Sequence, residues 1–227
     1  MALHLPELLP TKEQHRVELV DATVARANTI AISNTDSGWY DGDSGSHAPS
    51  NTSYFSGNDS FGNHYRNFFT FDLAAVAGET ITSAQLQLFT YDISSFGTYT
   101  TYEVTTPVST LTAGGSGQVT TYTDLGSGIS FGSIGLSHGQ SHSLILINLN
   151  AAAVAAIQAN ANIAAMFAIG GDFLGGDAFG FSNFDTRNQL ILQTQTQSMP
   201  ESTSTLELML MVGLFGVFVK FSGLASA

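Results

Sequence analysis

Three aspartates in a short stretch rich in Gly and Ser are the first residues whose type and spacing could do chemistry. Asp36, Asp41 and Asp43 fall within eight residues of one another. Calcium takes about six to eight oxygen ligands, which carboxylates and backbone carbonyls on flexible loops can supply. Asp59 or Asp72 could complete such a set, although the closing glutamate of an EF-hand loop is missing. Asp and Gly also favour tight turns, so a calcium site and a run of turns both stay open as interpretations.

The same polar region, residues 33–63, is punctuated by aromatic side chains. Trp39, Tyr40 and Tyr54 stand among Gly, Ser, Asn and Asp residues. An aromatic ring offers a large apolar area with few rotatable bonds to immobilise, which suits it to stack on the face of a sugar. These three residues are therefore the candidates for a surface that binds extracellular polysaccharide. The alternative interpretation is that the rings close one end of the hydrophobic core.

Patterns that would indicate catalysis are weak in this sequence. There is no cysteine, which excludes disulfides, thiolate metal sites and a cysteine nucleophile. His138 and His142 have the spacing of a zinc-binding helix, but the intervening Gly139 favours a turn. Glycoside hydrolysis needs a pair of carboxylates, and the only glutamates between residues 28 and 196, Glu79 and Glu103, have turn or surface contexts. We predict a non-enzymatic protein without catalytic residues, for which calcium is the one candidate cofactor.

The charge balance argues against nucleic acid as a partner. The chain carries a formal net charge of −12 at pH 7. Between Asn28 and Ser198, twelve acidic residues stand against two basic ones, Arg66 and Arg187. A phosphate-binding surface needs Lys and Arg to displace the counterions of the nucleic acid, and two arginines cannot form such a patch. Neutral polymers and divalent cations remain as partners.

Alternation of apolar and polar residues predicts that most of the chain forms β-strands. The clearest alternation runs from Ile81 to Tyr91, where Leu86 and Leu88 face inward while Gln85 and Gln87 face the other way. Further strands are expected at residues 29–32, 66–73, 98–104, 129–136, 143–149, 165–169 and 189–193.

Only one segment has the composition of a helix. Asn150 can cap it, and Ala151 to Ala159 consists almost entirely of strong helix formers. One short Ala-rich helix among seven or more short strands with Gly-rich turns favours an all-β fold. We predict a jelly-roll-like β-sandwich.

The sequence divides into three regions, at residues 1–27, 28–196 and 197–227. The first ends in Ala25-Arg26-Ala27, the small-x-small form of a signal-peptidase site, but lacks the apolar stretch that should precede it. A polar N-terminal tail and a damaged signal peptide are its two interpretations. The last contains the mostly apolar residues 206–224, close to the length of about 20 that spans a membrane. We predict a C-terminal apolar helix that contacts the membrane.

A short motif stands between the central domain and the apolar stretch. Pro200 and Glu201 follow Met199, and Ser202 comes next. This arrangement resembles the sorting signal of PEP-CTERM proteins, the exported bacterial substrates of exosortase. In that family a Val-Pro-Glu-Pro motif precedes an apolar helix and a short basic cluster. Here Met199 takes the first position, Ser202 replaces the second proline, and the basic cluster is absent.

The central domain carries a second resemblance. Tyr65 to Leu73, followed by Ile81 to Leu88, is similar to sandwich modules of the carbohydrate-binding type and to the bodies of other exported proteins of this family. The resemblance implies export to the cell surface or extracellular matrix, with transient membrane anchoring. It also implies a sorting protease or transpeptidase that acts on the tail, but no defined biochemical activity.

Overall fold

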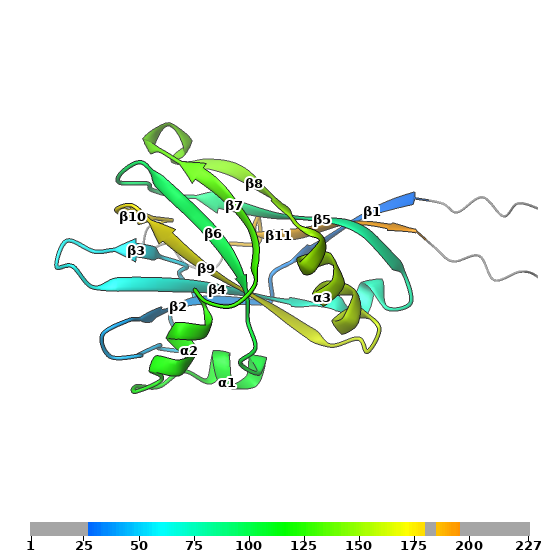
Figure 1. Ribbon diagram of the computed structural model, residues 1–227, viewed down its shortest axis with the longest axis horizontal. Helices are drawn as coiled ribbons and strands as arrows, with labels where there is room; N and C mark the ends of the chain where they lie inside the picture. The colour runs from blue at the N-terminus through cyan, green and yellow to red at the C-terminus, as the bar shows by residue number, and fades with distance from the viewer. Residues whose placement is uncertain (1–26, 180–184, 196–227) are drawn as a thin grey trace, which may run out of the picture. The chain divides into compact units, whose positions relative to one another are not determined.

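Two antiparallel β-sheets face each other across a hydrophobic core (Figure 1). The computed structural model describes residues 27–179 and 185–195. One sheet has four strands in the order β1-β11-β5-β8; the other has seven, in the order β10-β3-β4-β9-β6-β7 with β2 paired to β4. The strands are β1 (Ala27–Ser33), β2 (Asp36–Asp41), β3 (Ser56–Asn58), β4 (His64–Asp72), β5 (Thr80–Thr90), β6 (Gly97–Glu103), β7 (Ser130–Leu136), β8 (Ser143–Leu149), β9 (Met166–Leu174), β10 (Asp177–Ala178) and β11 (Gln189–Gln195). The predicted all-β sandwich is confirmed.

The four-stranded sheet has one buried face and one solvent face. Along β5, Leu86 and Leu88 are fully buried, whereas Gln85 and Gln87 remain partly exposed. Its neighbours β11 and β8 alternate in the same way. Successive side chains of a strand point to opposite faces of the sheet. The exposed and partly exposed side chains of the three strands therefore share one outer surface. The predicted orientation of β5 is confirmed.

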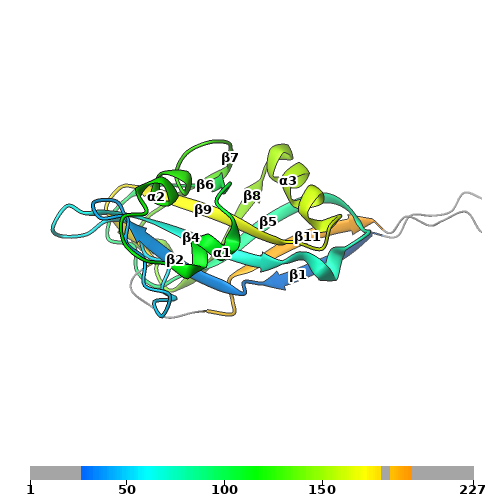
Figure 2. The same ribbon diagram turned by 90° about the horizontal axis from the view of Figure 1, so that it is seen from below.

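The seven-stranded sheet is covered on both faces at its centre. In β4, Phe69 and Phe71 enter the main core, while Phe68 joins a smaller cluster with Tyr40 and Leu111 on the opposite face. The short helices α1 (Val108–Ala113) and α2 (Val119–Asp124) lie on this opposite side (Figure 2). A strand buried on both faces loses its alternation, and residues 67–71 are accordingly all buried, with Asn67 and Thr70 as the polar members.

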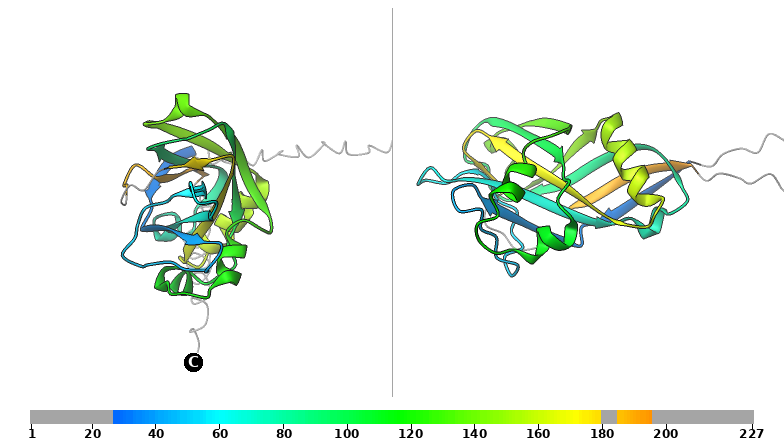
Figure 3. Two further views of the ribbon diagram at one scale, coloured as in Figure 1. Left: turned by 90° about the vertical axis from the view of Figure 1, so that its left-hand side faces the viewer. Right: turned by 60° about the horizontal axis from the view of Figure 1, so that its bottom comes forward.

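The predicted Ala-rich helix is confirmed as α3, Ala151–Ala161. The side chain of Asn150 accepts a hydrogen bond from the backbone N–H of Ala153 at 3.1 Å, the contact expected of an N-cap. Ala153 and Ile157 are fully buried. The helix contacts β5 of one sheet and both β7 and β9 of the other (Figure 3), so it fills the space between the two sheets.

The chain changes sheets between β1 and β2. The backbone N–H of Asn34 donates to the carbonyl of Asn188, beside the four-stranded sheet, and that of Thr35 donates to Thr70 in β4. In Figure 2, β1 and β2 follow one another along the lower side of the sandwich. The polar segment expected over residues 33–63 thus contains β2 and β3. Composition hid these strands, because it is pairing with β4 that makes them strands.

Several predictions fall outside the described residues. They concern the N-terminal tail or signal peptide, the linker with Pro200 and Glu201, and the apolar helix at residues 206–224. No helix in the described ranges is long and apolar enough to cross a membrane. Besides α3 and the two short helices α1 and α2, which were not predicted, the structure contains two 3-10 turns, at Leu73–Val76 and His138–Gln140.

Candidate functional site

The structure buries two of the three aromatic residues predicted to stack on sugars. Tyr40 and Tyr54 are fully buried. The Tyr40 hydroxyl donates to the carbonyl of Leu111 at 2.8 Å, and the Tyr54 hydroxyl donates to that of Phe89 at 2.9 Å. Burial raises the pKa of Tyr40 to about 12. A ring that stacks on a ligand needs a free face, so the prediction is wrong for these two residues, which belong to the core as the alternative interpretation stated.

Trp39 is the one predicted aromatic residue that reaches solvent. It is partly exposed on β2, where its indole N–H donates to the Ser53 hydroxyl at 2.9 Å. Its ring meets that of Tyr65 edge-on, with 4.9 Å between centroids. Both contacts fix the ring against the domain, so Trp39 alone remains of the predicted stacking surface.

The three aspartates predicted to bind calcium do not come together. Asp36 and Asp41 stand at opposite ends of β2, and at about 3.3 Å per residue a strand separates them by roughly 16 Å. The Asp41 carboxylate accepts hydrogen bonds from the Asp43 backbone N–H and the Ser44 hydroxyl, as in a tight turn. Within the described ranges no group of three or more acidic or histidine side chains could hold a metal ion. The three-carboxylate site is therefore wrong, because β2 is extended where a loop was expected.

The solvent face of the four-stranded sheet gathers side chains of one chemical kind. We call it the amide face. Its polar members, which include five carboxamides, are Thr29, Gln85, Gln87, Asn148, Gln189 and Gln193, and its apolar members are Phe89, Leu144, Leu146 and Ile191. The register places Gln87 between Gln189 and Leu146, and Gln85 between Ile191 and Asn148. The set thus crosses all four strands.

Hydrogen bonds between strands hold these carboxamides in place. Gln85 donates to the Asn148 side-chain oxygen at 2.6 Å, linking β5 to β8. The Thr29 hydroxyl donates to the Gln193 side-chain oxygen at 3.0 Å, linking β1 to β11. Gln87 lies on β5, and its amide donates to the backbone carbonyl of Arg187, just before β11, at 2.9 Å. Because each carboxamide carries two donor hydrogens and an acceptor oxygen, groups remain free to bind a ligand.

No charged residue occurs in any of the four strands. The segments Ala27–Ser33, Thr80–Thr90, Ser143–Leu149 and Gln189–Gln195 contain no Asp, Glu, Lys or Arg. This is unusual for a sheet with a solvent face, whose edge strands commonly carry charges that prevent association. Leu144 and Leu146 are nevertheless 51 % and 48 % exposed. The amide face therefore combines neutral hydrogen-bonding groups with exposed apolar side chains.

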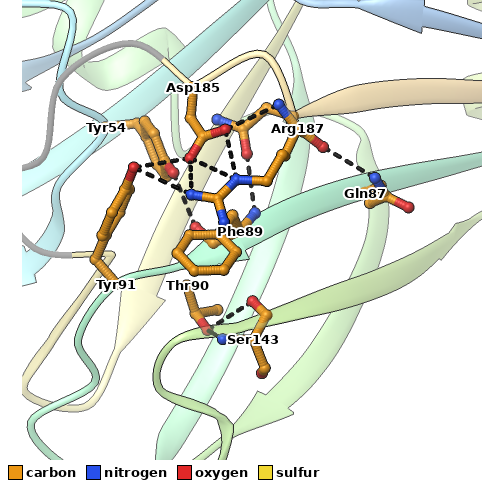
Figure 4. Close-up of polar contacts among 9 residues, drawn as sticks. Tyr54, Gln87, Phe89, Thr90, Tyr91, Ser143, Asp185 and Arg187 are labelled. Carbon is orange, nitrogen blue, oxygen red and sulfur yellow. Dashed lines mark hydrogen bonds and ion pairs between the residues drawn. The ribbon is translucent and has the colours of Figure 1, made fainter.

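An arginine borders the amide face at one end. The Arg187 guanidinium lies over the Phe89 ring, 3.4 Å from its centroid (Figure 4). Its Nε donates to Asp185 at 2.9 Å, and Asp185 also accepts from the Tyr91 hydroxyl at 2.7 Å. Burial by itself would raise the pKa of the Asp185 carboxyl, but hydrogen bonds from Arg187 and Tyr91 outweigh it and lower that pKa. The arginine charge is thus compensated within the protein, and Figure 4 shows the guanidinium between the Phe89 ring and the Asp185 carboxylate.

The sequence contained part of the signal for the amide face. Alternation predicted that Gln85 and Gln87 point outward, and Gln189 and Gln193 alternate with leucines in the same way. What the sequence did not show is that β11 pairs with β5 across about 100 residues. That pairing alone brings the glutamines together. Comparison of this chain with known protein families gives no match, and comparison with curated proteins gives none.

Proposed function

We propose that this chain is a non-enzymatic, exported surface or matrix protein whose sandwich domain binds a neutral polysaccharide on the amide face. One observation carries the proposal: a four-stranded sheet without any charged residue presents carboxamides and exposed leucines to solvent. Sugar hydroxyls donate and accept hydrogen bonds, as carboxamides do. The C–H face of a pyranose is apolar and can lie on Leu144 and Leu146. The solvent face of a four-stranded sheet gives an extended chain of such units a continuous surface to lie on.

The distribution of charge supports a neutral ligand over an anionic one. The two arginines of the predicted domain are both engaged with acidic partners, Arg66 with Asp172 at 3.1 Å and Arg187 with Asp185. The acidic excess of the domain repels polyanions over a Debye length of about 8 Å at physiological salt. We therefore expect binding that does not weaken as salt concentration rises.

Export and sorting rest on the resemblance of the tail. We propose that Pro200 and Glu201 mark the chain for a sorting protease or transpeptidase, and that residues 206–224 anchor it transiently to the membrane. Fractionation of bacterial cells tests this. Full-length protein should appear in the membrane or extracellular fraction, and a variant lacking residues 206–224 should leave the membrane. Full-length protein confined to the soluble cytosol would refute the assignment.

Binding is tested by sedimentation of the full-length chain with insoluble neutral and anionic polysaccharides. We expect saturable binding to at least one neutral polymer, unchanged in concentrated NaCl. Leu146→Ala should weaken this binding several-fold because it removes exposed apolar area from the amide face along the edge strand β8. Leu174→Ala is the matched control: Leu174 is 65 % exposed on β9, away from the face, and its loss should not matter.

A second variant separates the amide face from the remaining predicted aromatic. If Trp39→Ala abolishes binding while Leu146→Ala does not, the polysaccharide binds at β2 and the amide face is only a solvated surface. If no polymer is retained, the polysaccharide-binding part of the proposal fails, while the surface or matrix role still depends on the fractionation result.

A further inference from the structure

A groove lies between α3 and the segment that leads from β6 into α1. Its volume is about 190 Å³, space for roughly six water molecules or one small organic molecule. The segment 103–108 forms one wall, α3 contributes Ala156 and Asn160, and the start of β9 contributes residues 166–168. The groove belongs to the seven-stranded side of the sandwich and is separate from the amide face.

The polar side chains that line the groove offer acceptors and almost no donors. The Thr105 and Thr106 hydroxyls each donate at 2.8 Å to the Asp124 carboxylate, as do their backbone N–H groups at 2.9 and 2.7 Å. Their hydrogens are therefore committed, and only oxygen lone pairs remain. The Asn160 side-chain nitrogen donates to the carbonyl of Ala156 at 2.9 Å, an orientation that leaves its oxygen as an acceptor.

Glu103 supplies the charge of the groove. Its carboxylate makes no hydrogen bond or ion pair with any residue in the described ranges, although the side chain is partly buried. No Lys, Arg or His lines the groove. A register shift between Thr101 and Tyr102, where β6 pairs with β7, lies directly before Glu103, and such irregularities commonly redirect a neighbouring side chain. The Glu103 oxygens and the Asn160 side-chain oxygen are thus acceptors of the groove that lack a hydrogen-bond donor among those residues, and only Glu103 carries a charge.

The remaining lining is apolar. Val104, Pro107, Val108, Met166 and Phe167 surround the polar atoms. A ligand that fits this surface has several N–H donors, a positive charge and a short hydrocarbon body. We propose that the groove binds a small organic cation of the primary ammonium or guanidinium class, with Glu103 as its counter-ion. Charge-assisted hydrogen bonds to the Glu103 carboxylate and neutral ones to Asn160 would hold the cationic head.

Titration of the full-length chain with n-butylammonium, followed by amide chemical shifts in NMR spectra, tests this proposal. Saturable shifts should appear at residues 103–108 and at Asn160, with a dissociation constant of about a millimolar because the ligand is small. 1-Butanol has the same hydrocarbon body but no charge and should bind at least tenfold more weakly. Tetramethylammonium has the charge without N–H donors and should also bind more weakly.

Two variants test whether the Glu103 carboxylate binds the n-butylammonium cation. Glu103→Gln keeps the shape of the side chain and removes its charge, and it should weaken n-butylammonium binding at least tenfold. Asp92→Asn is the matched control, because Asp92 is an exposed acid outside the groove and its substitution makes the net charge less negative by the same amount. Equal binding by wild type and Glu103→Gln, equal binding of n-butylammonium and butanol, or no saturable shift at these residues would each overturn the assignment. None of these results depends on polysaccharide binding.

Discussion

Gly171 in β9 is the position where the addition of one methyl group should damage the domain most. A Cβ atom at residue 171 would lie 1.8 Å from the Tyr99 hydroxyl oxygen and 2.4 Å from the Asn67 side-chain oxygen. Both side chains are fully buried. Tyr99 donates to Asn67 at 2.7 Å, and Asn67 donates to the carbonyl of Tyr54 at 2.7 Å. Neither group can move without breaking this chain of hydrogen bonds.

The expected loss of unfolding free energy is the sum of an overpacking cost and the cost of a broken buried hydrogen bond. Forcing additional volume into a packed core costs about 1–3 kcal/mol, and leaving a buried polar group without its partner costs about 1–3 kcal/mol more. Replacing a strand glycine by alanine also stabilises the folded state by at most about 1 kcal/mol, because it lowers the conformational entropy of the unfolded chain. We expect Gly171→Ala to lower the free energy of unfolding by about 3 kcal/mol.

Chemical denaturation measures this change, with the fluorescence of Trp39, the only tryptophan, as the signal. Gly135→Ala is the matched control. Gly135 also lies in a strand of the seven-stranded sheet, and a Cβ there would meet nothing within 4 Å. Its substitution should change stability by less than about 1 kcal/mol. Equal denaturation midpoints for the two variants would refute the reasoning. Tyr99→Phe should also cost less in the Gly171→Ala background than in wild type, because it removes the oxygen in the clash.

Three further substitutions have defined outcomes. Because its pKa is lowered, Asp185 contributes stability above the unfolded carboxyl pKa of about 4, and this is lost as pH falls through the folded value. Asp185→Asn should therefore lower Tm near neutral pH and flatten its fall in acid; unchanged acid dependence would contradict the role of the Arg187 pair. Asp124→Ala removes four hydrogen bonds from residues 105–106 and should cost about 2 kcal/mol in urea denaturation; a loss near zero would show that this loop is held otherwise. Tyr40→Phe should leave the number of tyrosines that ionise below about pH 11 unchanged, since burial raises the Tyr40 pKa to about 12; loss of one titrating group in ultraviolet absorbance would mean that Tyr40 is exposed.

Where alternation was clear, local sequence was sufficient to predict the elements. β5 was predicted with its faces because leucine and glutamine alternate along it. α3 was predicted because strong helix formers follow a capping Asn150. β2 was missed because Asp36 to Asp41 has the composition of a turn. Its backbone is extended because β4 offers a partner edge, which composition does not encode.

For the candidate sites too, the sequence showed the residue types but not their surroundings. The residue types were visible in the sequence: aromatic rings, aspartates and outward glutamines. Their surroundings were not, because burial and proximity are set by strands far apart along the chain. Tyr40 is a core residue because it packs in a cluster with Phe68 and Leu111. Tyr54 is one because it packs in the main core beside Phe69.

What the sequence by itself determined was an acidic, alternating, all-β domain with too few basic residues to bind a polyanion. These properties depend on composition and on the two-residue period of a strand, and both are local. Only the tertiary structure decided that β5 lies beside β11, so that separate glutamines form one surface. It likewise placed Glu103 in a groove whose other walls come from α3 and β9. Both arrangements depend on strand order and register, which long-range packing selects.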